Sequence, residues 1–127
     1  MERLLQSKVC IITGAAQGIG KAIVKCFAED GAVVYAFDRQ EGIMDQWAEI
    51  CSERYMTKVI PVCCDITDSG SVKKSLMTIY KREGKIDVLV NNAGVVFNRK
   101  IGMIVPSVVV SEKHTDTLEI TEHPVEV

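Results

Sequence analysis

Apolar residues cluster in four short runs over the first ninety residues of the chain. Each run has four to six residues, the length of a strand that is buried on both faces of a sheet. The runs are residues 9–12, 32–37, 59–64 and 86–90. Pro61 falls inside the third run and removes one donor from the backbone hydrogen-bond ladder, which favours an edge position for that strand.

Between these runs, apolar residues recur every three or four positions, the spacing of amphipathic helices. They are Ile19, Ile23, Cys26 and Phe27 in the first segment, Ile43, Trp47, Ile50 and Cys51 in the second, and Val72, Leu76, Ile79 and Tyr80 in the third. Gly31 is well placed to end the first helix and Gly84 the third, because glycine readily adopts the left-handed conformation of a helix C-terminus. Asp68 or Ser69 can cap the third helix at its start.

Strands that alternate with helices through short links imply parallel pairing and right-handed crossovers. The sequence therefore predicts an α/β fold, half of a doubly wound parallel sheet with strand order 3-2-1-4, followed by a short β-rich C-terminal tail. We place the domain at residues 1–104 and the tail at residues 105–127. Right-handed crossovers put the first two helices on one face of the sheet and only the third on the other, which is then under-covered.

The amino-acid composition and net charge argue against some classes of binding partner. The 127 residues are 47% hydrophobic and 25% charged, with a net charge of −2 and no basic cluster, so neither nucleic acid nor an anionic membrane is a favoured partner. No apolar run approaches the length that spans a bilayer, and the first residues lack the apolar segment of a signal peptide. The five cysteines form no C-x-x-C pair, and we expect reduced, buried thiols in a cytoplasmic protein.

The turn after the first apolar run contains Gly14, Gly18 and Gly20. A strand, a glycine turn and a helix start together point backbone N–H groups and the positive end of the helix dipole at one spot, where a phosphate can sit. An ordinary turn is the alternative. With Thr13 in front, the spacing Gly-x-x-x-Gly-x-Gly resembles the cofactor motif of the short-chain dehydrogenase/reductase family.

Asp38 ends the second run, at the same predicted sheet edge as the glycine turn. A carboxylate there can accept hydrogen bonds from ribose hydroxyls and would repel a 2′-phosphate, which favours NAD over NADP. The uncharged Gln17 agrees with this preference. Arg39 argues against this preference, because its guanidinium could pair with the 2′-phosphate of NADP. The alternative for Asp38 is a simple turn residue.

The resemblance covers about residues 5–100 and implies a Rossmann fold. It further implies that Asp65 meets the adenine amino group with the Ile66 backbone alongside. The Asn-Asn-Ala-Gly run at residues 91–94 would line the adenosine side of the pocket and brace the sheet through its first Asn. The cofactor-binding set is then Thr13, Gly14, Gln17, Gly18, Ile19, Gly20, Asp38, Arg39, Asp65, Ile66, Asn91, Ala93 and Gly94.

The family's catalytic Asn, Ser and Tyr-x-x-x-Lys lie downstream of the cofactor half, and these 127 residues do not contain them in recognisable form. The three tyrosines, Tyr35, Tyr55 and Tyr80, all precede the Asn-Asn-Ala-Gly run. We therefore assign no catalytic residue and expect no activity from the chain alone. The resemblance implies an oxidoreductase for an alcohol, a ketone or a 3-oxoacyl group. Two alternatives remain: activity by complementation with another chain, and a non-enzymatic assembly role of the tail.

The tail differs in character from the residues before it. Residues 108–110 and 117–121 are β-rich, and the polar stretch between them makes a hairpin plausible. Residues 117–127 faintly resemble a segment of phage tail and baseplate proteins, so a frameshift, fusion or engineered junction is an open alternative. The possible metal ligands His114, Asp116, Glu119 and His123 match no usual spacing, and we expect no metal site.

The fourth strand would lack its usual neighbour if the sheet ended there. An open apolar edge is a template for strand addition, and exposed apolar area beside it promotes association. Three outcomes are possible: residues 108–110 or 118–120 fold back as a substitute strand, two chains pair, or the protein aggregates. We expect self-association through this open sheet edge.

Overall fold

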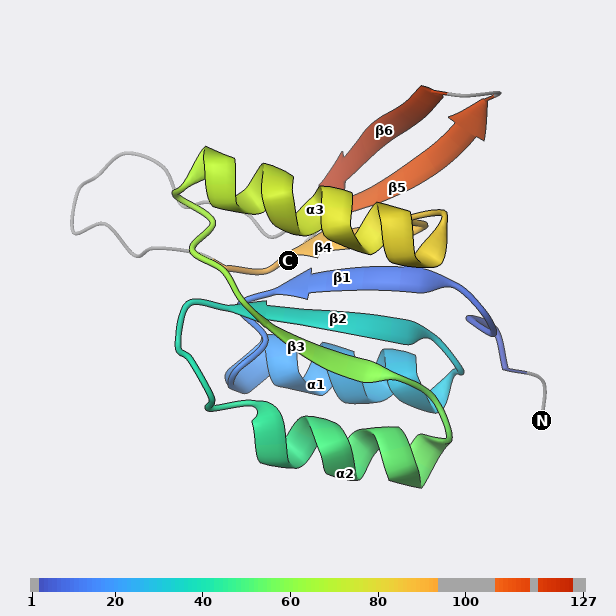
Figure 1. Cartoon of the computed structure of the whole chain (residues 1–127). Coiled ribbons are helices and arrows are strands. Elements are labelled where there is room, and N and C mark those ends of the chain that lie inside the picture. Colours follow the sequence, from blue (N-terminus) through green and yellow to red (C-terminus); the bar gives the residue numbers. More distant parts are fainter. Residues whose placement is uncertain (1–2, 94–106, 115–116, 125–127) are drawn as a thin grey trace.

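The computed structural model describes residues 3–93 in full and the backbone of residues 107–114 and 117–124. Strands and helices alternate through the first four strands, and two strands follow without an intervening helix among the described residues (Figure 1). The strands are β1 (Val9–Thr13), β2 (Val33–Asp38), β3 (Val59–Cys63), β4 (Val88–Asn91), β5 (Ser107–His114) and β6 (Thr117–Pro124). The helices are α1 (Gly18–Glu29), α2 (Asp45–Tyr55) and α3 (Ser69–Glu83).

All six strands form one sheet in the order β3-β2-β1-β4-β5-β6. The pairs β3–β2, β2–β1 and β1–β4 are parallel, so the predicted α/β half-sheet of order 3-2-1-4 is confirmed. β5 is antiparallel to β4, and β6 is antiparallel to β5. Pro61 lies in β3, which is an edge strand as its sequence predicted.

Helices α1 and α2 cover one face of the sheet (Figure 1). The buried residues of α1 are Gly20, Val24 and Ala28, while Ile19 is 72% exposed and Cys26 is also exposed. The predicted apolar face is therefore wrong at Ile19 and Cys26. The helix turns its small residues inward because they let its backbone approach the strands closely.

The same correction applies to α2. Its buried residues are Ala48 and Cys51, with Met44 just ahead of the helix, whereas Ile50 is 56% exposed and Ile43 is exposed as well.

The five cysteines are all free thiols, but they differ in exposure: Cys10, Cys51 and Cys64 are buried, and Cys26 and Cys63 are exposed. The expectation of buried thiols therefore holds for three of the five.

Helix α3 alone covers the opposite face in the described part of the chain (Figure 1). It buries Ile79 and packs Val72, Leu76 and Tyr80 against Tyr35 and Phe37 of β2, among others. The Asp68 carboxylate caps its start by accepting a 3.2 Å hydrogen bond from the Ser71 N–H, and Gly84 ends it in the left-handed conformation. Within the described residues, no helix has the length and apolar character needed to cross a bilayer.

The edge of β4 is paired, so the expectation of an open edge at this strand is wrong. Residues Val88, Leu89 and Val90 of β4 lie opposite Val110, Val109 and Val108 of β5. The substitute strand at residues 108–110, the alternative that we weighed less, is the arrangement in the structure. An antiparallel neighbour satisfies the same row of backbone groups that a parallel one would.

The two outer strands are now β3 and β6, and β3 offers little to a further strand. The Ser52 hydroxyl accepts from the Val59 N–H at 2.9 Å and lies 3.3 Å from the Val59 carbonyl, while it donates to the Ala48 carbonyl at 2.9 Å. Pro61, the next outward-facing position, has no N–H. A side chain and a proline thus occupy the positions that strand addition would need.

Candidate functional site

Four strand ends of the parallel half meet at one edge of the sheet. Thr13 ends β1, Asp38 ends β2, Cys63 ends β3 and Asn91 ends β4. The register places Asp38 beside Cys63 and Thr13 beside Phe37, so the residues that follow each strand are neighbours across the sheet. The glycine turn, Asp38, Asp65 and the Asn-Asn-Ala segment thus lie at one edge, which we call the carboxyl edge.

The glycines of the turn have different roles. A Cβ on Gly20 would lie 2.1 Å from the Gly14 carbonyl oxygen, and one on Gly14 would lie 2.9 Å from the Ala93 Cα. These two glycines therefore let the turn pack on itself and on the segment after β4. Gly18 has φ of +60°, and among the described residues a Cβ there would meet nothing within 4 Å. Only Gly18 faces open space, where a ligand can approach the backbone.

The Thr13 side chain joins the turn to the segment after β4. Its buried hydroxyl accepts from the N–H groups of Asn92 and Ala93, both at 3.0 Å, and donates to the Val90 carbonyl at 3.3 Å. The Asn92 amide donates to the Gly14 carbonyl at 3.3 Å. Thr13 and Asn92 therefore fix the position of the glycine turn.

Asn92 is missing from the predicted site set, although it lies in the Asn-Asn-Ala-Gly run. The Asn-Asn-Ala-Gly run contains two adjacent asparagines, whose side chains point to opposite sides in an extended chain. The sequence alone does not show that it is Asn92 whose side chain bonds the Gly14 carbonyl. The bracing role expected of Asn91 stays a prediction. Gly94 lies outside the described residues, as do the side chains of the possible metal ligands in the tail.

Asp38 is held by the backbone of two loops. Its Oδ2 accepts from the Ala16 N–H at 3.2 Å and its Oδ1 accepts from the Gln40 N–H at 3.0 Å. In addition, the Ala15 N–H donates to the Phe37 carbonyl at 3.0 Å, so the turn and the end of β2 are joined twice. The carboxylate is half-buried and has a fixed orientation at the edge.

The start of α1 lacks a side-chain cap. Gln17 occupies the N-cap position in an extended conformation without a side-chain hydrogen bond, and the first turn contains no acidic residue. The start of α3, by contrast, is capped by Asp68. The N–H groups of the first turn of α1 therefore face the carboxyl edge with no side-chain acceptor from residues 3–93, which suits an anion.

Asp65 lies beyond β3 and is exposed. Its Oδ1 accepts from the Thr67 hydroxyl at 2.7 Å and from the Thr67 N–H at 2.9 Å, and these two bonds are the main cause that lowers the pKa of its carboxyl. The positive charge of Arg39 lowers the pKa further, so Arg39 acts on a carboxylate of this edge. Ile66, 43% exposed, follows directly.

The tyrosine nearest the centre of the fold is directed away from this edge. The Tyr35 hydroxyl donates to Glu83 Oε1 at 2.7 Å. Glu83 is the last residue of α3, which runs back from the carboxyl edge to the opposite edge of the sheet. The structure therefore gives Tyr35 a structural partner and no place at the candidate site.

A family model described as short chain dehydrogenase matches residues 8–118. The chain belongs to the short-chain dehydrogenase family. The match includes the glycine turn, Asp38, Asp65 and the Asn-Asn-Ala-Gly run, the features on which the resemblance was based. It also continues past residue 104, where we place the start of the tail; that boundary stays a prediction.

Curated relatives agree with the family. The chain is 43% identical over 91 residues to the 3-oxoacyl-(acyl-carrier-protein) reductase FabG of Thermotoga maritima, covering 72% of this chain and 37% of the relative. It is 38% identical over 96 residues to the NAD-dependent glycerol dehydrogenase of Listeria innocua, covering 76% and 36%. The chain thus spans little more than a third of the length of these relatives.

Solved structures show the same partial coverage. L-sorbose reductase from Gluconobacter frateurii, complexed with NADPH and L-sorbose, matches with a TM-score of 0.72 and 33% identity over 80% of this chain and 38% of the reductase. NAD+-bound xylitol dehydrogenase matches with a TM-score of 0.67 and 29% identity over 72% and 35%. The chain therefore corresponds to the N-terminal, cofactor-binding region of a short-chain oxidoreductase, in a family that uses NAD or NADP.

Proposed function

We propose that the carboxyl edge binds NAD, with the pyrophosphate at the start of α1 and the adenosine between Asp38 and Asp65. The observation that carries this proposal is the pairing of an uncapped helix start with an oriented carboxylate on the neighbouring strand. The open space at Gly18 lets the pyrophosphate approach the backbone N–H groups. The exposed Ile19 and Ile66 offer apolar surface on either side.

The preference for NAD over NADP rests on Asp38. Its carboxylate is already fixed by the Ala16 and Gln40 N–H groups, so the remaining oxygen lone pairs can accept from both ribose hydroxyls. A 2′-phosphate would meet the same carboxylate and be repelled. Arg39 opposes this preference, because its guanidinium could pair with a 2′-phosphate.

The proposed chemistry is that of an oxidoreductase acting on an alcohol, a ketone or a 3-oxoacyl group, for which the bound nicotinamide supplies hydride transfer. In these 127 residues we assign no proton donor at the carboxyl edge, and we propose that they bind the dinucleotide without turning it over. The contribution of this chain is binding and orientation. General acid–base catalysis alone adds about 10²–10⁴-fold to a rate, so its absence would be measurable.

Calorimetric titration of the folded chain with NAD, NADP and ADP-ribose tests the binding proposal. We expect NAD to bind more tightly than NADP, and Asp38→Ala to reduce the ratio of the two affinities by about tenfold, because it removes one like-charge repulsion. Asp30→Ala is the matched control, since Asp30 lies at the far end of α1 and its loss changes the net charge equally. No binding at millimolar ligand, or equal ratios in both variants, would contradict the proposal.

A further inference from the structure

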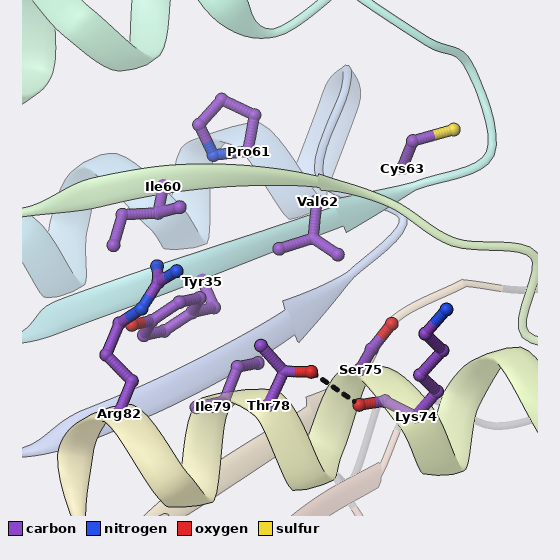
Figure 2. A pocket seen from close by; sticks show the side chains of 10 residues that line it. All are labelled: Tyr35, Ile60, Pro61, Val62, Cys63, Lys74, Ser75, Thr78, Ile79 and Arg82. Atoms are coloured by element: carbon purple, nitrogen blue, oxygen red, sulfur yellow. Dashed lines mark hydrogen bonds between the residues drawn. The ribbon is translucent and has the colours of Figure 1, made fainter.

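A groove runs between β3 and α3 on the face that α3 covers, with a volume of about 390 Å³ (Figure 2). Its lining includes Tyr35, Ile60, Val62, Lys74, Ile79 and Arg82. Figure 2 shows Ile60 and Val62 pointing toward α3, with Pro61 and Cys63 pointing away from it. The inner surface is therefore apolar, formed by Ile60, Val62 and Ile79 over the ring of Tyr35.

Two cations flank this apolar surface. Lys74 lies at one end of the groove and Arg82 at the other, and no acidic residue of the described part of the chain lines it (Figure 2). Neither cation belongs to the ion pairs of the described residues, Lys58–Glu83 and Lys85–Asp87, but the positive charge of Arg82 helps to lower the pKa of Glu83. Because Lys58 pairs with the same carboxylate at 3.0 Å, Lys58 and Arg82 together outnumber it and this end of the groove stays net positive. Since α-helical residues rise 1.5 Å each, eight positions along α3 separate the two cations by about 12 Å.

Most of the lining is exposed or half-buried, so the groove is open along its length. An enclosed small-molecule site would bury most of its ligand, which this groove cannot do. An open groove of this kind suits an extended polypeptide. Strand addition is not the mode of binding, because Ser52 occupies the N–H of Val59 and Pro61 has no N–H. The peptide must be recognised through its side chains.

We propose that this groove binds an extended acidic segment of a partner protein with the pattern Glu-x-Val-x-Glu. Alternate side chains of an extended chain point the same way, and residues four apart are separated by about 13 Å. The two glutamates would then reach Lys74 and Arg82, while the central valine packs on Val62 and Ile79. The distance between the two cations on α3, about 12 Å, thus matches the distance of about 13 Å between the two glutamates of the extended peptide.

The test uses the full chain and a labelled peptide, Ser-Glu-Ser-Val-Ser-Glu-Ser, followed by fluorescence anisotropy and by NMR of the methyl groups of Ile60, Val62 and Ile79. We expect saturable binding that weakens with salt and shifts those methyl signals. The double variant Lys74→Glu/Arg82→Glu should weaken binding by about tenfold or more, as expected for the loss of two exposed ion pairs.

The control variant is Lys73→Glu/Lys81→Glu, because these two lysines are exposed on the same helix outside the groove and their reversal changes the net charge equally. We expect it to retain binding within about twofold. The proposal is overturned if both variants lose affinity alike, if a peptide with both glutamates replaced by glutamine binds equally well, or if the folded chain binds no peptide at millimolar concentration.

Discussion

The parallel half of the sheet (β1–β4) and the hairpin of β5 and β6 differ in what their strand ends contribute to the carboxyl edge. In the parallel half every strand runs toward the carboxyl edge, and its ends supply Thr13, Asp38, Asp65 and Asn92 to one place. In the hairpin, β5 starts at that edge, with Ser107 opposite Asn91, and runs away from it. A strand that runs toward this edge brings the residue that follows it to the site, whereas β5, which runs away from the edge, can bring only the residue at its start.

The hairpin closes the open strand edge that a parallel half-sheet leaves at β4. A parallel neighbour for β4 needs a long crossover, while an antiparallel neighbour needs only a turn of the chain and then satisfies the same backbone groups. The hairpin closes the edge of β4 but extends the sheet by strands that contribute none of the four side chains named above. The hairpin therefore completes the sheet without adding to these site side chains.

The largest effect is expected at the most closely packed point of the parallel half. Gly20→Ala places a Cβ 2.1 Å from the Gly14 carbonyl oxygen, so the turn must move, and we expect a loss of about 3 kcal/mol in the free energy of unfolding. Denaturant unfolding measures it. Gly70→Ala is the control, because its nearest contact would be 3.4 Å away, and it should stay within about 1 kcal/mol of the parent chain. Equal effects would contradict the assigned packing.

The next effect concerns the link between the glycine turn and β4. Thr13→Val keeps the shape of the side chain but leaves the N–H groups of Asn92 and Ala93 without their acceptor. We expect a cost of about 2 kcal/mol in unfolding free energy. Thr78→Val is the control, since its exposed hydroxyl donates only within α3. A Thr13 variant as stable as the control would show that other groups hold the turn.

Amide hydrogen exchange in β4 can compare the two regions, because alternate N–H groups of this strand face the parallel half and the hairpin. The Asp87 N–H donates to Val9 of β1, so by alternation the Leu89 N–H also faces β1, while those of Val88 and Val90 face β5. An isolated hairpin is only marginally stable, so we expect exchange at Val88 and Val90 to be about tenfold faster than at Leu89. Equal rates would mean that the hairpin and the parallel half open as one unit.

The smallest effect depends on pH. The hydrogen bond from Tyr35 is the largest cause that holds the pKa of Glu83 below its ordinary value of 4.5. A lowered folded-state pKa stabilises the fold above the unfolded value, and this stabilisation is lost as pH falls through the folded value. Tyr35→Phe should therefore cost about 1 kcal/mol at pH 7 and progressively less below pH 4.5.

Unfolding curves of the Tyr35→Phe variant at a series of pH values measure this difference. Tyr80→Phe is the matched control. Tyr80 is half-buried and lies in α3, the helix that contains Glu83, but the hydroxyl bonded to Glu83 is that of Tyr35. A pH-independent difference for Tyr35→Phe would indicate that the hydroxyl acts through packing and that Glu83 does not respond to it.

Much of the parallel half was predictable because its signals are local. Short apolar runs, helical spacing, the capping residue Asp68 and the edge proline Pro61 each depend on a few neighbouring residues, and together they predicted the strand order. The meeting of the glycine turn, Asp38 and Asp65 followed from the same order, since parallel strands end at one edge. Local sequence patterns were therefore enough to predict the fold of this half and most of the candidate site.

Contacts between distant segments decided the rest. The inward face of α1 depends on how closely Gly20 approaches Gly14, which leaves Ile19 outside. Whether Asn91 or Asn92 reaches the turn depends on the phase of β4, and the blocked edge of β3 depends on Ser52 from the preceding helix. The antiparallel fit of β5 on β4 is a long-range choice between neighbours that satisfy the same backbone groups. Local patterns do not carry such choices, because they are settled only when the segments meet.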